Sequence, residues 1–152
     1  MRLIQEVLAL AGLVVQMVLV GSYWHVLPRQ VPMHFDARGA VDAYGDKSTL
    51  LILAGVTAGL YVLLTVVSFF PQYFNYPAKV TPENRGRMQG IATAMIGWMK
   101  AEFTWLFSYI VWVTIRVAMG RASGLGWAFL PVMLAVIGVT VVRGVVRMRQ
   151  AA

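Results

Sequence analysis

Long stretches of the sequence contain no Asp, Glu, Lys or Arg, and this feature limits the fold more than any other. The uncharged runs cover residues 7–24, 50–70 and 122–142. A helix that crosses a bilayer needs about 20 mostly apolar residues, with about 18 as a lower limit. In addition, 59% of the residues are hydrophobic and 12% are charged, whereas a soluble domain has about 25% charged residues. We therefore expect an integral membrane protein.

A fourth apolar stretch completes the expected set of spans, although Lys100 and Glu102 interrupt it. We predict a single all-α integral membrane domain over residues 1–152 with four transmembrane helices. The expected spans and loops are residues 4–24, 50–70, 91–116 and 125–146, with an outer loop at 25–49 and a cytoplasmic loop at 71–90. The first run is expected to be retained rather than cleaved as a signal peptide, because no small-x-small cleavage site follows it.

The distribution of Lys and Arg predicts the orientation in the membrane. Seven of these residues lie in the N-terminus, the second loop and the C-terminal tail, and five lie in the first and third loops. By the positive-inside rule both termini are cytoplasmic and the first loop faces outward. We expect a multi-pass membrane protein whose positively charged segments, with a net charge of +7 for the chain, lie beside an anionic leaflet of the bilayer rather than bind nucleic acid. The absence of cysteine excludes disulfides and thiolate metal sites.

Small residues predict where helices approach one another. Gly55 and Gly59 form a Gly-x-x-x-Gly spacing, which favours packing against another helix of the chain or, alternatively, a homo-oligomer seam. Lys100 is expected near the cytoplasmic surface, where its long side chain can extend into water. A stripe of small and polar residues on the same segment is suited to facing a second helix: Thr93, Gly97, Thr104 and Ser108.

The outer loop contains a dense group of polar side chains and is predicted to be structured. Apolar and polar residues alternate over residues 31–35 and 40–44, which is typical of two short strands. These strands would form a β-hairpin between the first two spans. Asp36 and Gly39 occupy the first and fourth positions of the segment between them, as in a type I turn. Asp46 or Ser48 would cap the helix that follows.

His34 and Asp42 fall on opposite sides of this turn, so one site could use both. Imidazole and carboxylate suit zinc or another divalent ion, with His25 as a third candidate ligand. The same groups suit acid–base chemistry. The alternative is structural: His34 would hydrogen-bond within the hairpin, and Asp36 would serve the turn.

Glu102 is a second candidate for function because it lies within a predicted span. A carboxylate inside a bilayer is costly unless it is paired or protonated, and it marks functional sites for that reason. The alternative places Glu102 at headgroup depth among Trp98 and Trp105.

The outer loop carries a motif made of Leu27-Pro28, Val31-Pro32, His34-Phe35, Gly39, Asp42, Gly45 and Lys47. This motif resembles that of an uncharacterised bacterial membrane domain that forms the N-terminal half of SdpI-type immunity proteins. A second signature, Phe74-Asn75-Tyr76-Pro77 followed by residues 80–85, is similar to that of the short single-domain members. The resemblance implies protection of a producer cell from its own secreted toxin.

Three functions follow as hypotheses. The first is a non-enzymatic SdpI-like membrane protein, active in immunity or envelope stress, whose outer loop binds a peptide, lipid or membrane-protein partner. The second is a membrane metalloenzyme or hydrolase that uses His34 and Asp42. The third is a small transporter or channel subunit that uses Glu102 and Lys100. The candidate ligand-binding residues are His34, Phe35, Gly39, Asp42, Tyr44, Lys47 and Glu102.

Overall fold

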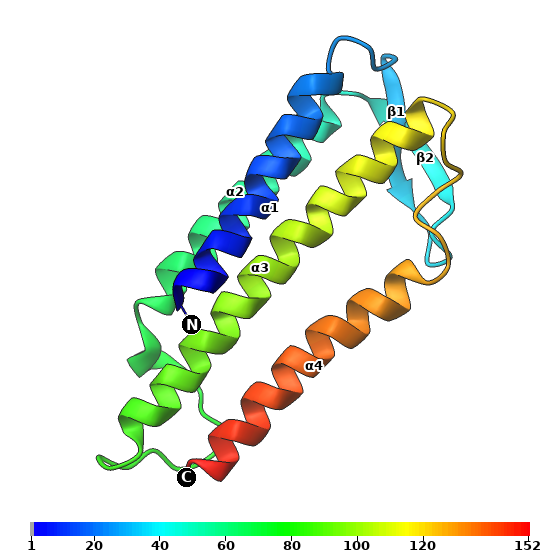
Figure 1. Cartoon of the computed structure of the whole chain (residues 1–152). Helices are drawn as coiled ribbons and strands as arrows, with labels where there is room; N and C mark the ends of the chain where they lie inside the picture. The colour runs from blue at the N-terminus through cyan, green and yellow to red at the C-terminus, as the bar shows by residue number, and fades with distance from the viewer. Residues whose placement is uncertain (1) are drawn as a thin grey trace.

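The computed structural model describes residues 2–152 as a helical bundle with one small sheet (Figure 1). In chain order the elements are α1 (Arg2–Tyr23), β1 (Gln30–Phe35), β2 (Val41–Asp46), α2 (Thr49–Ser68), η1 (Pro71–Tyr73), α3 (Arg85–Ala118) and α4 (Phe129–Gln150). The strands pair antiparallel, which confirms the hairpin predicted between the first two helices. Both described ends of the chain lie at one end of the bundle, and the hairpin lies at the other.

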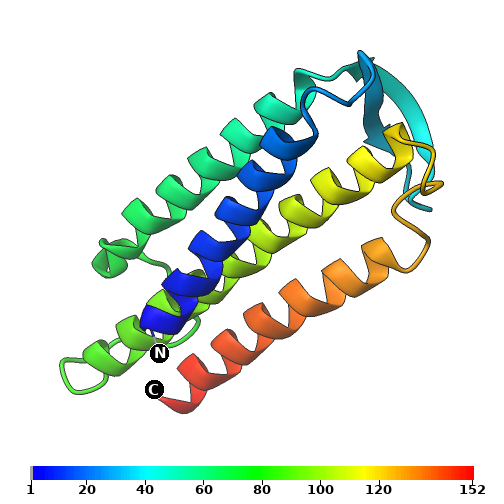
Figure 2. The ribbon, with the colours of Figure 1, turned by 45° about the horizontal axis from the view of Figure 1, so that its top comes forward.

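α3 is the central helix of the bundle. α1 and α2 pack on one side of it, and α4 packs mainly against its other side (Figure 2). Its 34 residues correspond to a length of about 51 Å at 1.5 Å per residue. Each of the helices α1, α2 and α4 therefore packs against α3.

Three helices, α1, α2 and α4, are long and apolar enough to cross a membrane. They correspond to the predicted spans at residues 4–24, 50–70 and 125–146. The predicted third span, residues 91–116, lies within α3 and is one continuous helix. α3 is not among the three helices that meet the length and hydropathy requirement, so its crossing remains a prediction.

The contact between α1 and α3 is close and polar. Ser108 donates its hydroxyl to the backbone oxygen of Gly12 at 2.6 Å, and a Cβ atom at Gly12 would lie 2.7 Å from Thr104 Oγ1. The predicted stripe on α3 is buried throughout, with Thr104 and Ser108 1% and 2% exposed. Its expected role in facing another helix is therefore confirmed.

The glycine pair of α2 does not have its predicted role within the chain. A Cβ atom added at Gly55 or at Gly59 would meet no neighbouring atom within 4 Å. The side chains of α2 that are buried are instead Leu50, Ala54 and Thr57. The expectation of intramolecular packing at the pair is wrong, because α2 is rotated so that both glycines point away from α1 and α3.

Candidate functional site

The hairpin turn is fixed by Asp36. Its carboxylate accepts hydrogen bonds from the backbone N–H groups of Arg38 at 2.8 Å and Ala40 at 2.9 Å. The N–H of Gly39 donates to the Asp36 backbone oxygen at 2.9 Å, and Gly39 has a φ of +78°, which favours glycine. The predicted turn is confirmed, and Asp36 serves its backbone.

His34 and Asp42 meet across the hairpin. His34 Nδ1 lies 2.6 Å from Asp42 Oδ1, and the two side chains are 67% and 46% exposed. An ionised carboxylate only accepts hydrogen bonds, so the imidazole donates through Nδ1–H. Nε2 of a neutral imidazole is then left with its lone pair, in an orientation fixed by the carboxylate. The structure thus brings together the two residues that the sequence singled out.

This pair supplies two ligands for a metal ion. Over residues 2–152, no three His, Cys, Asp or Glu side chains are grouped closely enough to hold a metal, so His25 is not placed with His34 and Asp42. Catalytic zinc sites use three protein ligands and an open position. A metal at this pair would need solvent or partner groups for the rest of its coordination, and the zinc site remains a prediction.

The base of the hairpin is attached to α1 and α2. Lys47 Nζ donates to the backbone oxygen of Trp24 at 2.8 Å and lies 4.8 Å from the centre of its ring. Asp46 accepts from the N–H of Ser48 at 2.9 Å, and the hydrogen bonds from Ser48 hold the pKa of Asp46 below its usual range. Buried Val31 joins the hydrophobic core at this end of the bundle. Lys47 and Asp46 therefore hold the loop on the helices.

The tip of the hairpin contacts the loop between α3 and α4, which the sequence did not predict. Ala40 and Gly124 form an isolated antiparallel bridge, and the N–H of Leu125 donates to the Gly39 backbone oxygen at 2.8 Å. A Cβ atom at Gly39 would lie only 2.5 Å from the backbone oxygen of Gly126. In the sequence, only the glycines of this loop indicate that another segment of backbone comes close, and they do not show which segment it is.

Two of the remaining candidates differ in exposure. Tyr44 on β2 is 59% exposed, and Phe35 at the end of β1 is intermediate. Neither side chain forms a hydrogen bond or an aromatic contact within residues 2–152. Met33, which was not a candidate, is 55% exposed, and its side chain lies next to Gly45 of β2. The hairpin thus has exposed aromatic and thioether groups in addition to the exposed His34–Asp42 pair.

Lys100 and Glu102 lie on different sides of α3. Lys100 is 2% exposed, because its ammonium group is hydrogen-bonded to Glu6 and to Thr65 Oγ1 and lies 4.6 Å from the centre of the Tyr61 ring. The expectation that Lys100 extends to the surface is therefore wrong. Sequence reasoning missed Glu6 as its partner, although a carboxylate near the start of an apolar helix is itself a signal for one.

Glu102 contacts α4 instead. Its Oε1 accepts a hydrogen bond from the Thr140 hydroxyl, and its Oε2 is buried without a partner in the described chain. The structure therefore does not place Glu102 and Lys100 on one polar path, and it places neither residue at the hairpin.

Residues 11–58 match a family model described as Domain of unknown function (DUF1648). The match begins in α1, includes the whole hairpin and ends in α2. No curated protein and no solved structure matches this sequence.

Proposed function

We propose that this chain is a non-enzymatic membrane protein of the SdpI-like class whose hairpin binds a partner on the outer side of the bacterial inner membrane. The partner class we favour is a peptide, lipid or membrane protein of the envelope. The DUF1648 match supports the choice of class, because it is centred on the same segment as the resemblance. Immunity to a secreted toxin is the role that the resemblance implies.

We include α3 as a fourth span. Its length of about 51 Å exceeds the hydrocarbon thickness of about 30 Å. It also packs between α4 and the pair α1–α2, three helices that are apolar enough to span. Its one fully buried charge, Lys100, is paired with Glu6, which reduces the cost of placing it in lipid.

The proposed orientation rests on how Lys and Arg are distributed between the two ends of the bundle. Seven Lys and Arg residues belong to the segments at the end that carries the termini, and five belong to the segments at the hairpin end. The positive-inside rule then places the termini in the cytoplasm and the hairpin outside.

One observation carries the binding proposal: the hairpin is held at its base and at its tip, and its candidate contact groups remain exposed. Lys47 holds the base to Trp24, and Gly39 holds the tip to Leu125. Binding to a preformed surface loses less conformational entropy than binding to a flexible loop. Exposed tyrosine and methionine side chains are enriched in the core of protein interfaces, and Tyr44 and Met33 provide both.

Site-specific photo-crosslinking in cells tests this function. A photoreactive phenylalanine derivative at Tyr44 should give a discrete adduct, and His34→Ala should reduce its yield. Tyr73 is the control, because it is a tyrosine at the opposite end of the bundle that is more exposed than Tyr44, at 80%. If Tyr44 gives no adduct, or only the adducts that Tyr73 gives, the hairpin is not the binding surface.

The His34–Asp42 pair gives specific support to a second candidate, a membrane metalloenzyme or hydrolase. The 2.6 Å contact orients an imidazole whose Nε2 can bind a metal or accept a proton. Metal analysis of the purified protein separates the two readings. About one divalent ion per chain that is lost in both His34→Ala and Asp42→Asn, with folding retained, supports the enzyme.

A further inference from the structure

A groove follows the line where α4 meets α3, and its two halves differ in chemistry. The half nearer the hairpin has a volume of about 720 Å³ and is lined mainly by apolar and aromatic residues, including Trp105, Phe129 and Val136. The half nearer the termini has a volume of about 550 Å³ and is lined by three arginines. Trp98 and Glu102 line both halves, so the groove is continuous.

The arginines of the groove are Arg87, Arg143 and Arg147. All three are exposed, and none forms an ion pair with any residue in the range 2–152. Glu102 is the one acidic residue among the lining residues, so the three arginines leave a net charge of at least +2. This end of the groove therefore attracts an anion.

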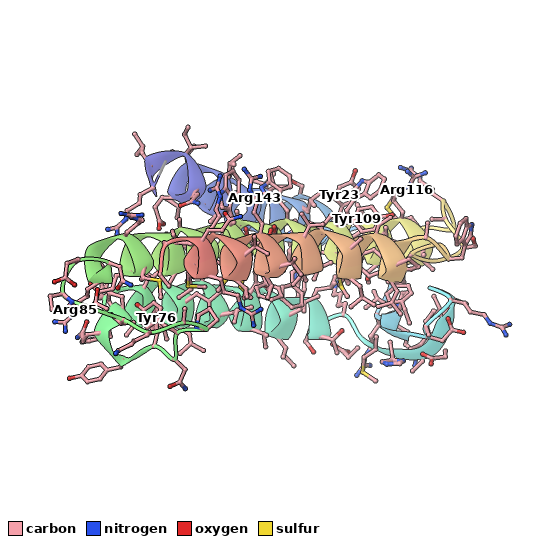
Figure 3. The ribbon with its side chains drawn as sticks, turned by 90° about the horizontal axis from the view of Figure 1, so that it is seen from below. Tyr23, Tyr76, Arg85, Tyr109, Arg116 and Arg143 are labelled. Atoms are coloured by element: carbon pink, nitrogen blue, oxygen red, sulfur yellow. The ribbon has the colours of Figure 1, made fainter. Side chains whose placement is uncertain are left out.

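The groove is long enough to hold a lipid chain. Phe129 and Arg143 are 14 positions apart on α4, which is about 21 Å along the helix axis. Half of the hydrocarbon core is about 15 Å thick. Figure 3 shows Arg143 nearer the Arg85 end of the molecule and Tyr109 nearer the Arg116 end. An amphiphile with its charge at Arg143 would thus extend its tail toward the aromatic half.

We propose that this groove binds an anionic phospholipid from the leaflet on the side of the chain termini. The phosphate lies among Arg87, Arg143 and Arg147, and one acyl chain lies along the aromatic half. A second copy of the chain fits less well, because an apolar helix in the groove would leave the arginines without counter-charges. The proposal uses residues outside the hairpin and does not depend on the proposed function.

Native mass spectrometry of the delipidated full chain, titrated with phosphatidylglycerol or with phosphatidylcholine of the same chain length, tests the site. Phosphatidylglycerol should bind more tightly by on the order of tenfold or more. Arg143→Gln/Arg147→Gln should weaken its binding roughly 30-fold, at about fivefold for each arginine near an anionic headgroup. The loss should be smaller at high salt, because salt screens the contribution of the arginines.

The matched control is Arg85→Gln/Arg149→Gln, which removes the same charge at the same end of the molecule but from residues that do not line the groove. It should leave phosphatidylglycerol binding within about twofold. In a separate variant, Val136→Trp fills the apolar half at a side chain that is 47% exposed and should weaken both lipids. Equal binding of the two lipids, equal losses in the two arginine pairs, or dimers in place of lipid adducts would each overturn the proposal.

Discussion

Replacing Gly39 with alanine tests whether the hairpin tip is held by the loop between α3 and α4. Gly39 has a φ of +78° and lies close to the backbone of Gly126. A Cβ atom added at Gly39 would lie 2.5 Å from the Gly126 backbone oxygen. Gly120 in the same loop offers a matched control. It has a φ of +70°, yet its Cβ would meet nothing within 4 Å.

The two substitutions share the backbone cost and differ in what the added Cβ atom meets. Alanine in the left-handed region costs about 1–2 kcal/mol at either position. At Gly39 the added atom also forces the tip away from Gly126, which costs about 1 kcal/mol for the lost hydrogen bond from Leu125. It adds at least about 1 kcal/mol of overpacking strain. Gly39→Ala should therefore destabilise the hairpin tip by about 2 kcal/mol more than Gly120→Ala.

Hydrogen exchange of the Leu125 amide, measured by mass spectrometry on protein in nanodiscs, reports this difference directly. A 2 kcal/mol difference corresponds to roughly 30-fold faster exchange in Gly39→Ala than in Gly120→Ala. Similar exchange rates in the two variants would show that the tip is not docked, and would remove the basis for a rigid binding surface.

Three further predictions concern the bundle and the base of the hairpin. Gly12→Val should lower the free energy of unfolding by about 1–3 kcal/mol in a detergent unfolding assay, whereas Gly21→Val, with no neighbour within 4 Å of its Cβ, should not overpack. Lys100→Met should lower the free energy of unfolding by roughly 3 kcal/mol, because it removes one partner of a buried ion pair. This value is at the lower end of the range for such a change, since Glu6 is partly exposed. A thermal scan that matches the unmodified protein would refute the buried pair. The pKa of Asp46 is lowered in the folded protein, so the hairpin base should resist proteolysis fully above about pH 3.9, the pKa of an unfolded Asp. Proteolysis should increase as the pH falls through the lower folded-state pKa. Asp46→Asn should abolish this pH dependence.

Local features of the chain could be predicted from the sequence. Uncharged runs located three of the helices, and Asp36 with Gly39 located the turn, because helix length in lipid and turn geometry depend on neighbouring residues. His34 and Asp42 were paired correctly, since the length of a hairpin loop sets which residues are opposite one another.

Contacts between distant segments could not be predicted in the same way. The face of α2 that packs carries Thr57, Tyr61 and Thr65 at four-residue spacing. The small-residue spacing of Gly55 and Gly59 pointed instead to an open face. The pairing of Lys100 with Glu6 and the contact of Gly39 with Leu125 depend on how helices rotate and where loops meet. Neither is encoded in a local pattern.

Cysteine accessibility in intact cells tests the arrangement of the chain in the membrane most directly, because the sequence contains no cysteine of its own. Ala37 at the hairpin tip and Asn75 in the loop before α3 are both exposed and belong to opposite ends of the bundle. With a membrane-impermeant thiol reagent, Ala37→Cys should be labelled in intact cells and Asn75→Cys only after lysis. Labelling of Asn75→Cys in intact cells, with Ala37→Cys protected, would contradict an outward-facing hairpin.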